Sequence, residues 1–258
     1  MKALILAGGL GSRISEETVV KPKPMVEIGG FPILWHIMKI YSYYGIKDFI
    51  ILSGYKQEII KQFFLDYSLQ SSDFTISLKK NSIKVHKKIT EDWNVTILDT
   101  GKNTMTGGRI LKAKNYLKKN EDFCLTYGDG LSNININKLI KFHKSKKKIA
   151  TMSVVQPSGR YGAVKTNKEN LIEKFIEKPA GDGRWINGGF FVLNYKIFKY
   201  LKSDSDIWEQ GPLQKICADK NLLAYKHNGF WKAMDTLSDK RMFEEMWKKD
   251  RPWKIWND

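Results

Sequence analysis

Short apolar runs alternate with amphipathic segments along most of this chain, and this alternation limits the possible folds more than any other property of the sequence. Residues 2–7 and 48–53 are apolar runs with the length and composition of buried strands. Residues 32–44 and 57–67 instead repeat apolar side chains at the spacing of an amphipathic helix. Strands that alternate with helices predict an α/β domain, in which we expect a mostly parallel, Rossmann-like sheet with helices on both faces.

One stretch departs from this pattern. Within residues 74–98, apolar and polar side chains alternate, which is typical of antiparallel strands with one solvated face. We interpret 74–98 as a small antiparallel β insertion. The strand–helix alternation then returns, with strands expected at 123–127, 149–155, 189–193 and 223–226, a hairpin at 163–176, and helices at 107–120, 136–148, 195–202, 212–220 and 237–249. The length suits one domain, residues 1–258, with a C-terminal helical segment at about 237–258.

Charge and composition narrow the class of protein. The formal charge is +17, but no nucleic-acid-recognition motif accompanies it, so we expect no nucleic-acid partner. Cys124 and Cys217 are the only cysteines, which offers neither a disulfide framework nor a zinc ribbon. The apolar run after Met1 is too short for a signal peptide, and no stretch reaches the roughly 18 apolar residues of a membrane span. We therefore expect a cytoplasmic protein that does not span a membrane.

The segment after the first predicted strand is rich in glycine. It runs Leu6-Ala7-Gly8-Gly9-Leu10-Gly11-Ser12-Arg13. Glycines at this place let backbone N–H groups approach anionic oxygens closely, and Arg13 adds a planar fork that suits a triphosphate. The segment lacks the third glycine of a dinucleotide fingerprint and the Gly-Lys-Ser/Thr of a P-loop. A plain glycine-rich turn between strand and helix remains the alternative.

Two further segments carry candidate functional side chains. Ten residues after Arg13, Lys23 lies between Pro22 and Pro24, and the prolines present it at low entropic cost, unless the segment is an ordinary surface loop. Asp129 lies between glycines just after a predicted buried strand. A carboxylate there suits Mg²⁺, which takes one or two protein carboxylates and leaves its other positions to phosphate and water. An Asp-Gly hairpin turn is the alternative at this position.

Taken together, these motifs resemble the signature of the sugar-1-phosphate nucleotidyltransferases. In that family Gly-x-Gly-Thr-Arg is followed, after a spacer, by a Lys-Pro element; here Ser12 replaces the usual Thr and keeps the hydroxyl, and Ile14 replaces the usual Leu. Further segments resemble the cytidylyltransferase branch of the family. They lie at residues 15–20, 33–38, 105–109 and 231–236. The resemblance covers nearly the whole chain, and it implies the nucleotidyltransferase (GT-A-like) version of the α/β fold.

The resemblance also implies site residues. Catalytic roles would belong to Arg13 and Lys23, and metal binding to Asp129 and Asp235. The nucleotide would be bound by Leu6, Ala7, Gly8, Gly9, Leu10, Gly11, Ser12, Thr104, Arg109 and Gly128. The sugar phosphate would be bound by Gly162, Glu177, Lys178, Asn187 and Gly188. The residues alone leave open whether Asp235 caps the last helix, since Asp is a favoured N-cap, or lies at the site while Thr236 or Ser238 caps that helix.

The reaction implied by the resemblance moves CMP from CTP to α-D-glucose 1-phosphate, giving CDP-glucose and pyrophosphate, with uridylyl or thymidylyl transfer to another sugar 1-phosphate as the alternative. The resemblance further implies Mg²⁺ as cofactor, CTP and a sugar 1-phosphate as small-molecule partners, a role in O-antigen synthesis, and a homo-oligomer, with a hexamer among the expected forms. We expect Trp253 and Trp256 to pack against another subunit. A non-catalytic nucleotide or sugar sensor and a basic nucleic-acid binder stay open as other classes.

Overall fold

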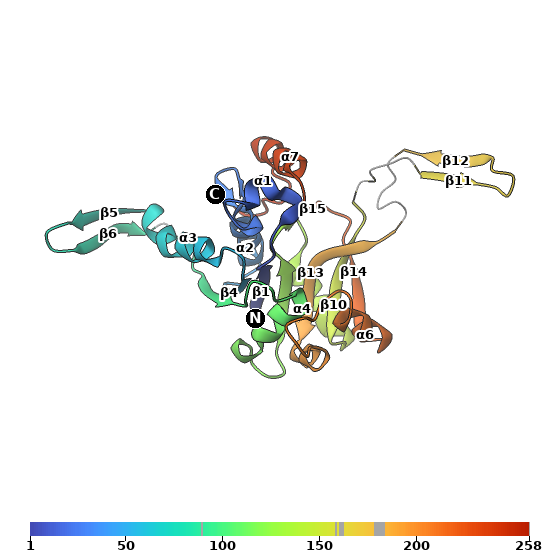
Figure 1. Ribbon diagram of the computed structural model, residues 1–258, viewed down its shortest axis with the longest axis horizontal. Coiled ribbons are helices and arrows are strands. Elements are labelled where there is room, and N and C mark those ends of the chain that lie inside the picture. Colours follow the sequence, from blue (N-terminus) through green and yellow to red (C-terminus); the bar gives the residue numbers. More distant parts are fainter. Residues whose placement is uncertain (89, 158, 160–162, 178–183, 258) are drawn as a thin grey trace.

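The computed structural model describes residues 1–257 apart from 89, 158, 160–162 and 178–183. A seven-stranded sheet with the order β14-β10-β13-β8-β1-β4-β7 lies at its centre (Figure 1). The strands are β1 (Lys2–Ala7), β4 (Asp48–Ser53), β7 (Asn94–Asp99), β8 (Asp122–Tyr127), β10 (Ala150–Val155), β13 (Ile186–Asn194) and β14 (Leu222–Lys226). Within this sheet β13 is antiparallel to both of its neighbours, and the other pairings are parallel. The prediction of a mostly parallel sheet is confirmed.

Both faces of the sheet are covered by helices, as the sequence predicts. Successive side chains of β1 point to opposite faces: Ala3 and Ile5 belong to one buried cluster, Leu4 and Leu6 to the other. The first cluster includes side chains of α2 (Ile33–Tyr43), α3 (Gln57–Gln70), α5 (Ile136–Lys146) and α7 (Leu237–Lys248). The second includes side chains of α4 (Thr106–Lys112) and α6 (Pro212–Ala218). This two-sided core fixes the strands whose ends carry the candidate site.

The predicted β insertion is too long, because its last strand belongs to the central sheet. β7 pairs in parallel with β4, from Asp48 opposite Asn94 to Ser53 opposite Asp99. As an edge strand it is only half-buried, so its apolar and polar residues alternate as in a solvated antiparallel strand. The insertion is therefore limited to β5 (Ser72–Ser77) and β6 (Ser82–Lys88), which pair as a separate hairpin.

Two predicted helices are also shorter or tighter than expected. The helix expected at 107–120 ends at Lys112 and continues only as a 3₁₀ turn, Lys114–Tyr116. The helix expected at 195–202 is a 3₁₀ segment, Tyr195–Tyr200, whose N-cap Asn194 accepts a hydrogen bond from the Lys196 amide. In both segments one or two turns are enough to pack the apolar side chains against the sheet, so a longer α-helix is not needed to bury them.

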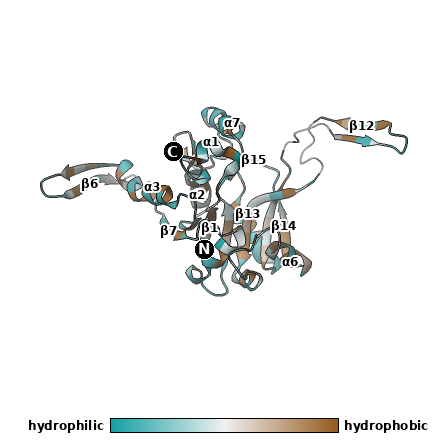
Figure 2. Cartoon of the chain, in the orientation of Figure 1, coloured by the Kyte–Doolittle hydropathy of each residue, from teal (hydrophilic) through white to brown (hydrophobic). Residues whose placement is uncertain are grey.

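Two hairpins extend away from the central body (Figure 1). One is β5–β6; the other, as the sequence predicts, is formed by β11 (Ala163–Thr166) and β12 (Ile172–Ile176). Hydrophobic residues are distributed along both hairpins, although each lies outside the core (Figure 2). They are thus the parts of the chain that contribute least to the sheet described above.

The C-terminal tryptophans do not face another subunit, contrary to the prediction. Trp253 is fully buried and Trp256 nearly so, and both belong to the core cluster on the α2 face of the sheet. Trp253 packs edge-on against Phe243 of α7 and donates a hydrogen bond to His36 of α2. The chain after α7 therefore returns to its own core. In the described part of the chain, no helix has the length and apolar character that crossing a membrane would need.

Candidate active site

A cleft of about 370 Å³ opens at the carboxyl ends of β1 and β8, which are neighbouring parallel strands. This is the edge at which α/β sheets bind ligands. Most of the residues predicted to bind nucleotide line it, namely Leu6, Ala7, Gly8, Gly9, Gly11, Ser12, Thr104, Arg109 and Gly128. Arg13, Lys23 and Asp129 line it too, whereas Leu10 lies outside the lining and is 54% exposed. The structure therefore brings together motifs that are far apart in the sequence.

The glycine-rich loop fits the cleft because several of its positions have no room for a side chain. A Cβ added to Gly8 would lie 2.2 Å from a guanidinium nitrogen of Arg109. Gly11 has φ 66°, in the left-handed region, and a Cβ there would lie 2.7 Å from Thr18. At Gly128, across the cleft, a Cβ would lie 2.6 Å from the Leu6 carbonyl oxygen. These glycines are required by close contacts, with side chains at Gly8 and Gly11 and with backbone at Gly128.

Lys23 is buried in this cleft rather than displayed on a surface loop. It begins a 3₁₀ turn, Lys23–Met25, and its side chain is only 10% exposed. Its Nζ donates to Asp129 Oδ2 at 2.6 Å and to Asp235 Oδ1 at 2.8 Å. Burial disfavours the charged ammonium, but the two carboxylates outweigh burial, and the pKa of Lys23 is raised above its usual value. One lysine thus joins the two predicted metal ligands.

Asp235 reaches the site through a second, very short sheet. β9 (Gly130–Ser132) pairs antiparallel with β15 (Trp231–Ala233), and the Met234 amide donates to the Asp129 carbonyl at 2.8 Å. Because β9 pairs with β15 and not with β8, Asp129 does not lie in a β8–β9 hairpin turn. Backbone pairing therefore fixes the separation of the two carboxylates.

The N-cap of α7 is Thr236, which resolves the alternative role of Asp235. Thr236 Oγ1 accepts from the Asp239 amide, and Asp239 in turn accepts from the Thr236 amide, forming a capping box. The Asp235 side chain is therefore not the cap. It lies outside the lining of the cleft but forms ion pairs with two residues that line it, Lys23 at 2.8 Å and Arg13 at 3.0 Å. The carboxylate pair is accordingly balanced by two basic side chains, Lys23 and Arg13.

The carboxylate oxygens of Asp129 and Asp235 suit a hard cation that is also coordinated by substrate phosphates. In the described ranges, no cluster of three or more His, Cys, Asp and Glu side chains is placed to hold a metal ion. Asp129 and Asp235 supply two carboxylates, the number that Mg²⁺ commonly takes from protein when substrate phosphates and water complete its shell. Lys23 demonstrates that both carboxylates can contact one cation, since a single ammonium contacts both. The residues present therefore fit Mg²⁺.

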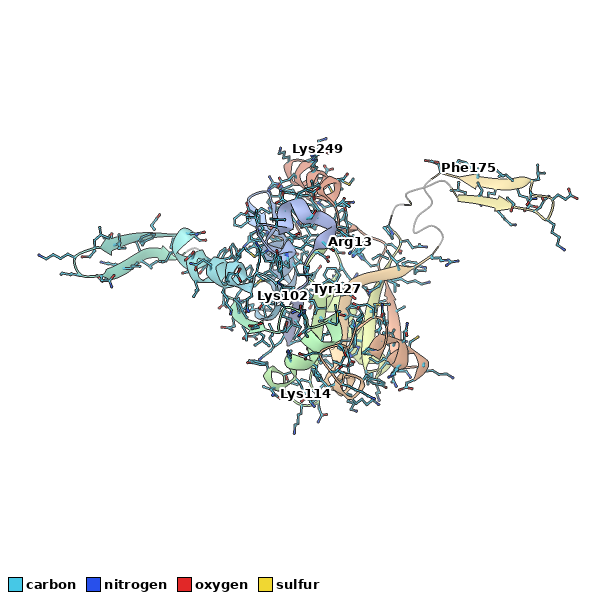
Figure 3. All side chains as sticks on the ribbon, viewed as in Figure 1. Arg13, Lys102, Lys114, Tyr127, Phe175 and Lys249 are labelled. Atoms are coloured by element: carbon cyan, nitrogen blue, oxygen red, sulfur yellow. The ribbon has the colours of Figure 1, made fainter. Side chains whose placement is uncertain are left out.

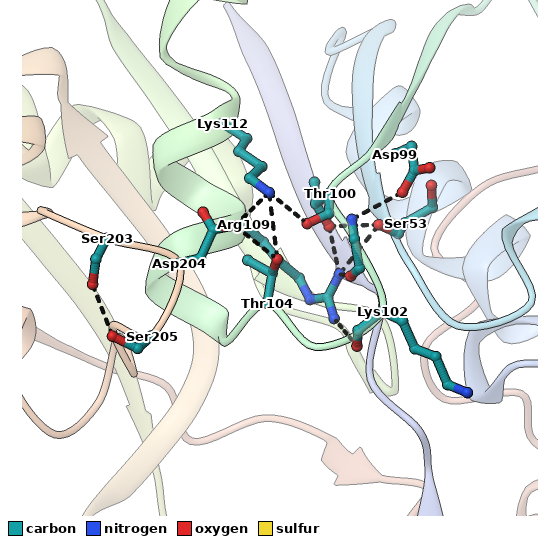
Figure 4. Close-up of polar contacts among 11 residues, drawn as sticks. Ser53, Asp99, Thr100, Lys102, Thr104, Arg109, Lys112, Ser203, Asp204 and Ser205 are labelled. Carbon is teal, nitrogen blue, oxygen red and sulfur yellow. Dashed lines mark hydrogen bonds and ion pairs between the residues drawn. The ribbon is translucent and has the colours of Figure 1, made fainter.

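Arg109 lines the cleft, but most of its hydrogen-bonding capacity is used within the protein (Figure 4). Its guanidinium donates to the carbonyls of Gly8, Ser53, Gly101 and Lys102, and to the Thr100 hydroxyl. Burial, only partly offset by nearby carboxylates, lowers its pKa from the usual value. Arg109 thus ties the glycine-rich loop to the ends of β4 and β7, whether or not it also contacts a nucleotide.

Thr104 has a similar supporting environment beside Arg109. Its hydroxyl donates to Asp204 at 3.3 Å, and Asp204 forms an ion pair with Lys112 at 2.7 Å (Figure 4). The backbone of the same wall is fixed by Asp204 and Asp206, whose carbonyls accept from the Met105 and Gly107 amides. The loop before α6 therefore supports the wall that carries two of the predicted nucleotide-binding residues.

The sequence analysis missed a polar network that links Tyr127, in the lining of the cleft, to Asn187, Glu209 and the first turn of α4. Tyr127 donates to Glu209 at 2.6 Å and accepts from Asn187 at 3.1 Å. Glu209 also accepts from Thr106 at 2.9 Å. Burial and the adjacent Glu209 raise the pKa of Tyr127 well above its usual value, so its hydroxyl stays protonated. Tyr127 directly precedes the Gly-Asp motif, so the sequence could have predicted it as a site residue. No local sequence pattern indicates such a role for Glu209.

The predicted sugar-phosphate residues are only partly placed. Asn187 contacts the Tyr127 network, and Gly188 has no space for a Cβ, which would lie 2.7 Å from Ser153 Oγ. Glu177 is exposed and follows β12 at the base of a hairpin, outside the cleft lining. Gly162 and Lys178 lie outside the described residues. The cleft therefore unites most of the predicted nucleotide-binding residues with Asp129, and Asp235 and Asn187 contact residues that line it.

Comparisons with known proteins point to one family. A family model for nucleotidyl transferases matches residues 2–239. The chain is 52% identical over 257 residues to the glucose-1-phosphate cytidylyltransferase of Salmonella typhimurium, covering 99% of this chain and all of that protein. It is 45% identical over 258 residues to the probable glucose-1-phosphate cytidylyltransferase of Bacillus subtilis, with 99% of this chain and 100% of that protein covered.

Solved structures share the fold at low sequence identity. HddC from Yersinia pseudotuberculosis, complexed with GMP-PN, superimposes with a TM-score of 0.68 at 23% identity, covering 95% of this chain and 99% of that chain. UDP-glucose pyrophosphorylase complexed with UDP-glucose gives a TM-score of 0.68 at 16% identity, with 97% and 99% covered. At these identities the likeness concerns the fold alone.

Proposed function

The chain belongs to the nucleotidyl transferase family, and we propose that it transfers CMP from CTP to α-D-glucose 1-phosphate, giving CDP-glucose and pyrophosphate. The structural observation that carries this proposal is the contact of one buried lysine, Lys23, with both Asp129 and Asp235 beside a glycine-rich loop. The two full-length relatives named above support the nucleotide and the sugar.

The reaction requires positioning more than proton transfer. A phosphate oxygen of the sugar 1-phosphate attacks the α-phosphorus of CTP; the bond from that phosphorus to the β-phosphate bridging oxygen breaks, and pyrophosphate leaves. The attacking oxygen is already anionic near neutral pH, so no general base is needed, and no histidine lines the cleft among the described residues. The protein's task is to bring two polyanions together and to stabilise the transition state electrostatically.

The residues of the cleft suit that task. Backbone amides of the glycine-rich loop and the Arg13 guanidinium bind the triphosphate. Lys23 offsets the charge that accumulates between the two phosphates. Asp129 and Asp235 would hold Mg²⁺, which would neutralise phosphate charge when bound. Arg109, through its bond to the Gly8 carbonyl, keeps the loop in the conformation that its amides need.

Fewer of the residues proposed to bind the sugar phosphate have a described position. Asn187, which donates to Tyr127 of the cleft lining, and the adjacent Gly188 would contact the sugar. Glu177, Lys178 and Gly162 are proposed to bind the sugar phosphate on the basis of their family motif. Glu177 would have to approach the cleft from the base of the β11–β12 hairpin, so substrate binding is expected to involve this segment.

We further propose a cytoplasmic homo-oligomer, with a hexamer as one candidate state, that supplies a nucleotide sugar for O-antigen synthesis and binds no nucleic acid. The support for self-association is the apolar surface of the two hairpins. Phe74, Ile76, Val164 and Phe175 are each at least 43% exposed, and a two-stranded hairpin is at best marginally stable when isolated in water. A second copy of the chain would cover these side chains.

The proposed function is tested by pairing each of CTP, UTP, dTTP and GTP with several sugar 1-phosphates in the presence of Mg²⁺ and measuring pyrophosphate release. Turnover is expected to be highest for CTP with glucose 1-phosphate, and to stop in excess EDTA. Faster turnover with another NTP would reassign the base. Undiminished turnover in EDTA would remove the metal from the mechanism, and no release with any pair would favour a non-catalytic sensor.

A further inference from the structure

The place between the two predicted metal ligands is taken by the protein's own cations. The Lys23 ammonium contacts one oxygen of Asp129 and one of Asp235. The other oxygen of Asp235 forms an ion pair with Arg13 at 3.0 Å. Three of the four carboxylate oxygens in this pair therefore already have a cationic partner.

The charges of this group cancel. Asp129 and Asp235 supply two negative charges, and Lys23 and Arg13 supply two positive ones. The Lys23 side chain is 10% exposed, so water screens its attraction to the carboxylates weakly, whereas Arg13 is 71% exposed and is screened more strongly. A divalent cation approaching this group meets no net negative charge and is repelled by the nearby ammonium.

A nucleoside triphosphate changes that balance. It offers Lys23 and Arg13 more acceptor oxygens and more negative charge than two carboxylates do, and both basic side chains line the cleft in which it is proposed to bind. If these side chains turn to the phosphates, the two carboxylates are left without a basic partner when a phosphate-bound cation arrives. Basic side chains and the cation thus exchange partners, without loss of charge balance.

We infer that Lys23, assisted by Arg13, is an internal counter-ion that keeps free divalent cations off Asp129 and Asp235 until a nucleoside triphosphate withdraws it, so that metal and nucleotide bind together. This inference rests on the proposed function, because it takes the two carboxylates as metal ligands. Lys23 then has two positions: it neutralises the carboxylates in the free protein and the phosphates in the complex.

The test is a Mn²⁺ titration of the full chain, followed by electron paramagnetic resonance of the free ion, without nucleotide and with a non-hydrolysable CTP analogue; the Mn²⁺ that the analogue binds without protein is measured separately and subtracted. Wild type should bind Mn²⁺ weakly alone and at least about tenfold more tightly with the analogue. Lys23→Met should bind free Mn²⁺ at least about tenfold more tightly than wild type does. Its gain from the analogue should be correspondingly smaller, because the repulsive ammonium is already gone.

Matched variants isolate the charge of Lys23. Lys23→Arg keeps the charge and should stay within about threefold of wild type. Lys21→Met removes a lysine two residues away, which pairs with Glu27 at 2.7 Å, and should also leave Mn²⁺ affinity unchanged. Arg13→Met should raise the affinity for free Mn²⁺, but by less than Lys23→Met does, because Arg13 is more exposed. If Lys23→Met does not fold, Arg13→Met carries the test.

Two failures are distinguishable. If wild type binds no Mn²⁺ even with the analogue, the metal role in the proposed function is wrong. If wild type binds Mn²⁺ with the analogue but Lys23→Met binds the free ion no more tightly than wild type, only the counter-ion inference is overturned. Thermal unfolding gives an independent readout: Lys23→Met should gain more in Tm from Mn²⁺ alone than wild type gains.

Discussion

The cleft and the two hairpins are built from opposite kinds of contact. In the cleft, Lys23 bonds to side chains that lie 106 and 212 residues further along the sequence. In the hairpins, β5 pairs with β6 and β11 with β12, so each contact joins residues of one short segment. Figure 3 shows the consequence, with Arg13 and Tyr127 close together in the body and Phe175 far out on a hairpin.

The difference also extends to what each region buries. The cleft places charged and polar side chains against one another, over a core that is complete within the chain. On the hairpins the cross-strand pairs Phe74–Val85 and Val164–Phe175 remain exposed. Chemistry is therefore expected to depend on the cleft, and association on the hairpins. The following experiments test whether activity depends on the cleft alone and self-association on the hairpins alone.

Neutralising Asp129 is expected to have the largest effect. Asp129→Asn keeps the size of the side chain but removes a charge that would hold Mg²⁺ and that faces Lys23. Pyrophosphate release should fall by about 10³-fold, the scale for losing a preorganised electrostatic group, while Asp235 still pairs with Lys23 and the fold persists. Asp92→Asn is the matched control, since Asp92 is 86% exposed in a surface ion pair. A variant that keeps more than a tenth of wild-type activity would break the assignment.

Acid is expected to destabilise the body through His36. Nε2 of this buried ring bonds to the Ile28 carbonyl at 2.8 Å, and Nδ1 accepts from Trp253, so the neutral ring is fully paired. Burial lowers its pKa to about 4. Below pH 6.5 the unfolded chain takes up a proton that the folded chain resists, so the free energy of unfolding should fall by about 3 kcal/mol between pH 6.5 and 4.

Urea unfolding at several pH values measures how the free energy of unfolding depends on pH. The His36→Gln variant should be less stable at pH 7 but should lack the part of the acid sensitivity that belongs to His36. Equal pH slopes for the variant and wild type would show that this ring does not control the acid stability of the body.

Adjacent glycines test how tightly the cleft is packed. A Cβ on Gly8 would overlap Arg109, whereas Gly9 has no atom within 4 Å of such a Cβ. Gly8→Ala should therefore lower the free energy of unfolding by about 2 kcal/mol, as overpacking does, and should raise KM for CTP. Gly9→Ala should change the free energy of unfolding by less than about 1 kcal/mol. Equal stability losses at the two positions would contradict the packing described here.

The hairpins should show the smallest effect on the fold. Phe175→Lys replaces a side chain that is 62% exposed, so the stability of the isolated chain should change by less than about 0.5 kcal/mol. Self-association, measured by sedimentation equilibrium, should weaken. Lys174→Gln, at the adjacent position of the same strand, is the control and should leave association unchanged. Unaltered association of Phe175→Lys would place the contact between copies elsewhere.

Local patterns were sufficient to predict most of the fold. The alternation of apolar runs and amphipathic helices gave the two-sided sheet, because each element in the core shows its own period. The prediction for β7 was wrong because an edge strand is half-buried and its alternation is that of a solvated strand. The short C-terminal segment with Trp253 was misinterpreted because nothing local shows that it returns to α2.

Prediction of the site was limited in a different way. Motifs with a local signature, such as the glycine-rich loop and Gly128–Asp129, were found and lie in one cleft. Glu209 was missed because its link to Tyr127 spans 82 residues and depends on the loop before α6. The capping role of Thr236 was marked in the sequence by Asp239 three residues later, and this signal could have separated it from Asp235 beforehand.

A double-substitution cycle on Asp129 and Asp235 tests most directly whether these two side chains act as one unit at a single cation. The readout is the rate of pyrophosphate release from CTP and glucose 1-phosphate by Asp129→Asn, Asp235→Asn and the pair. Each single change should slow the reaction by about 10³-fold, and the double variant should be no more than about tenfold slower than the slower single variant. Losses that multiply to about 10⁶-fold would show two independent groups and would contradict the shared site.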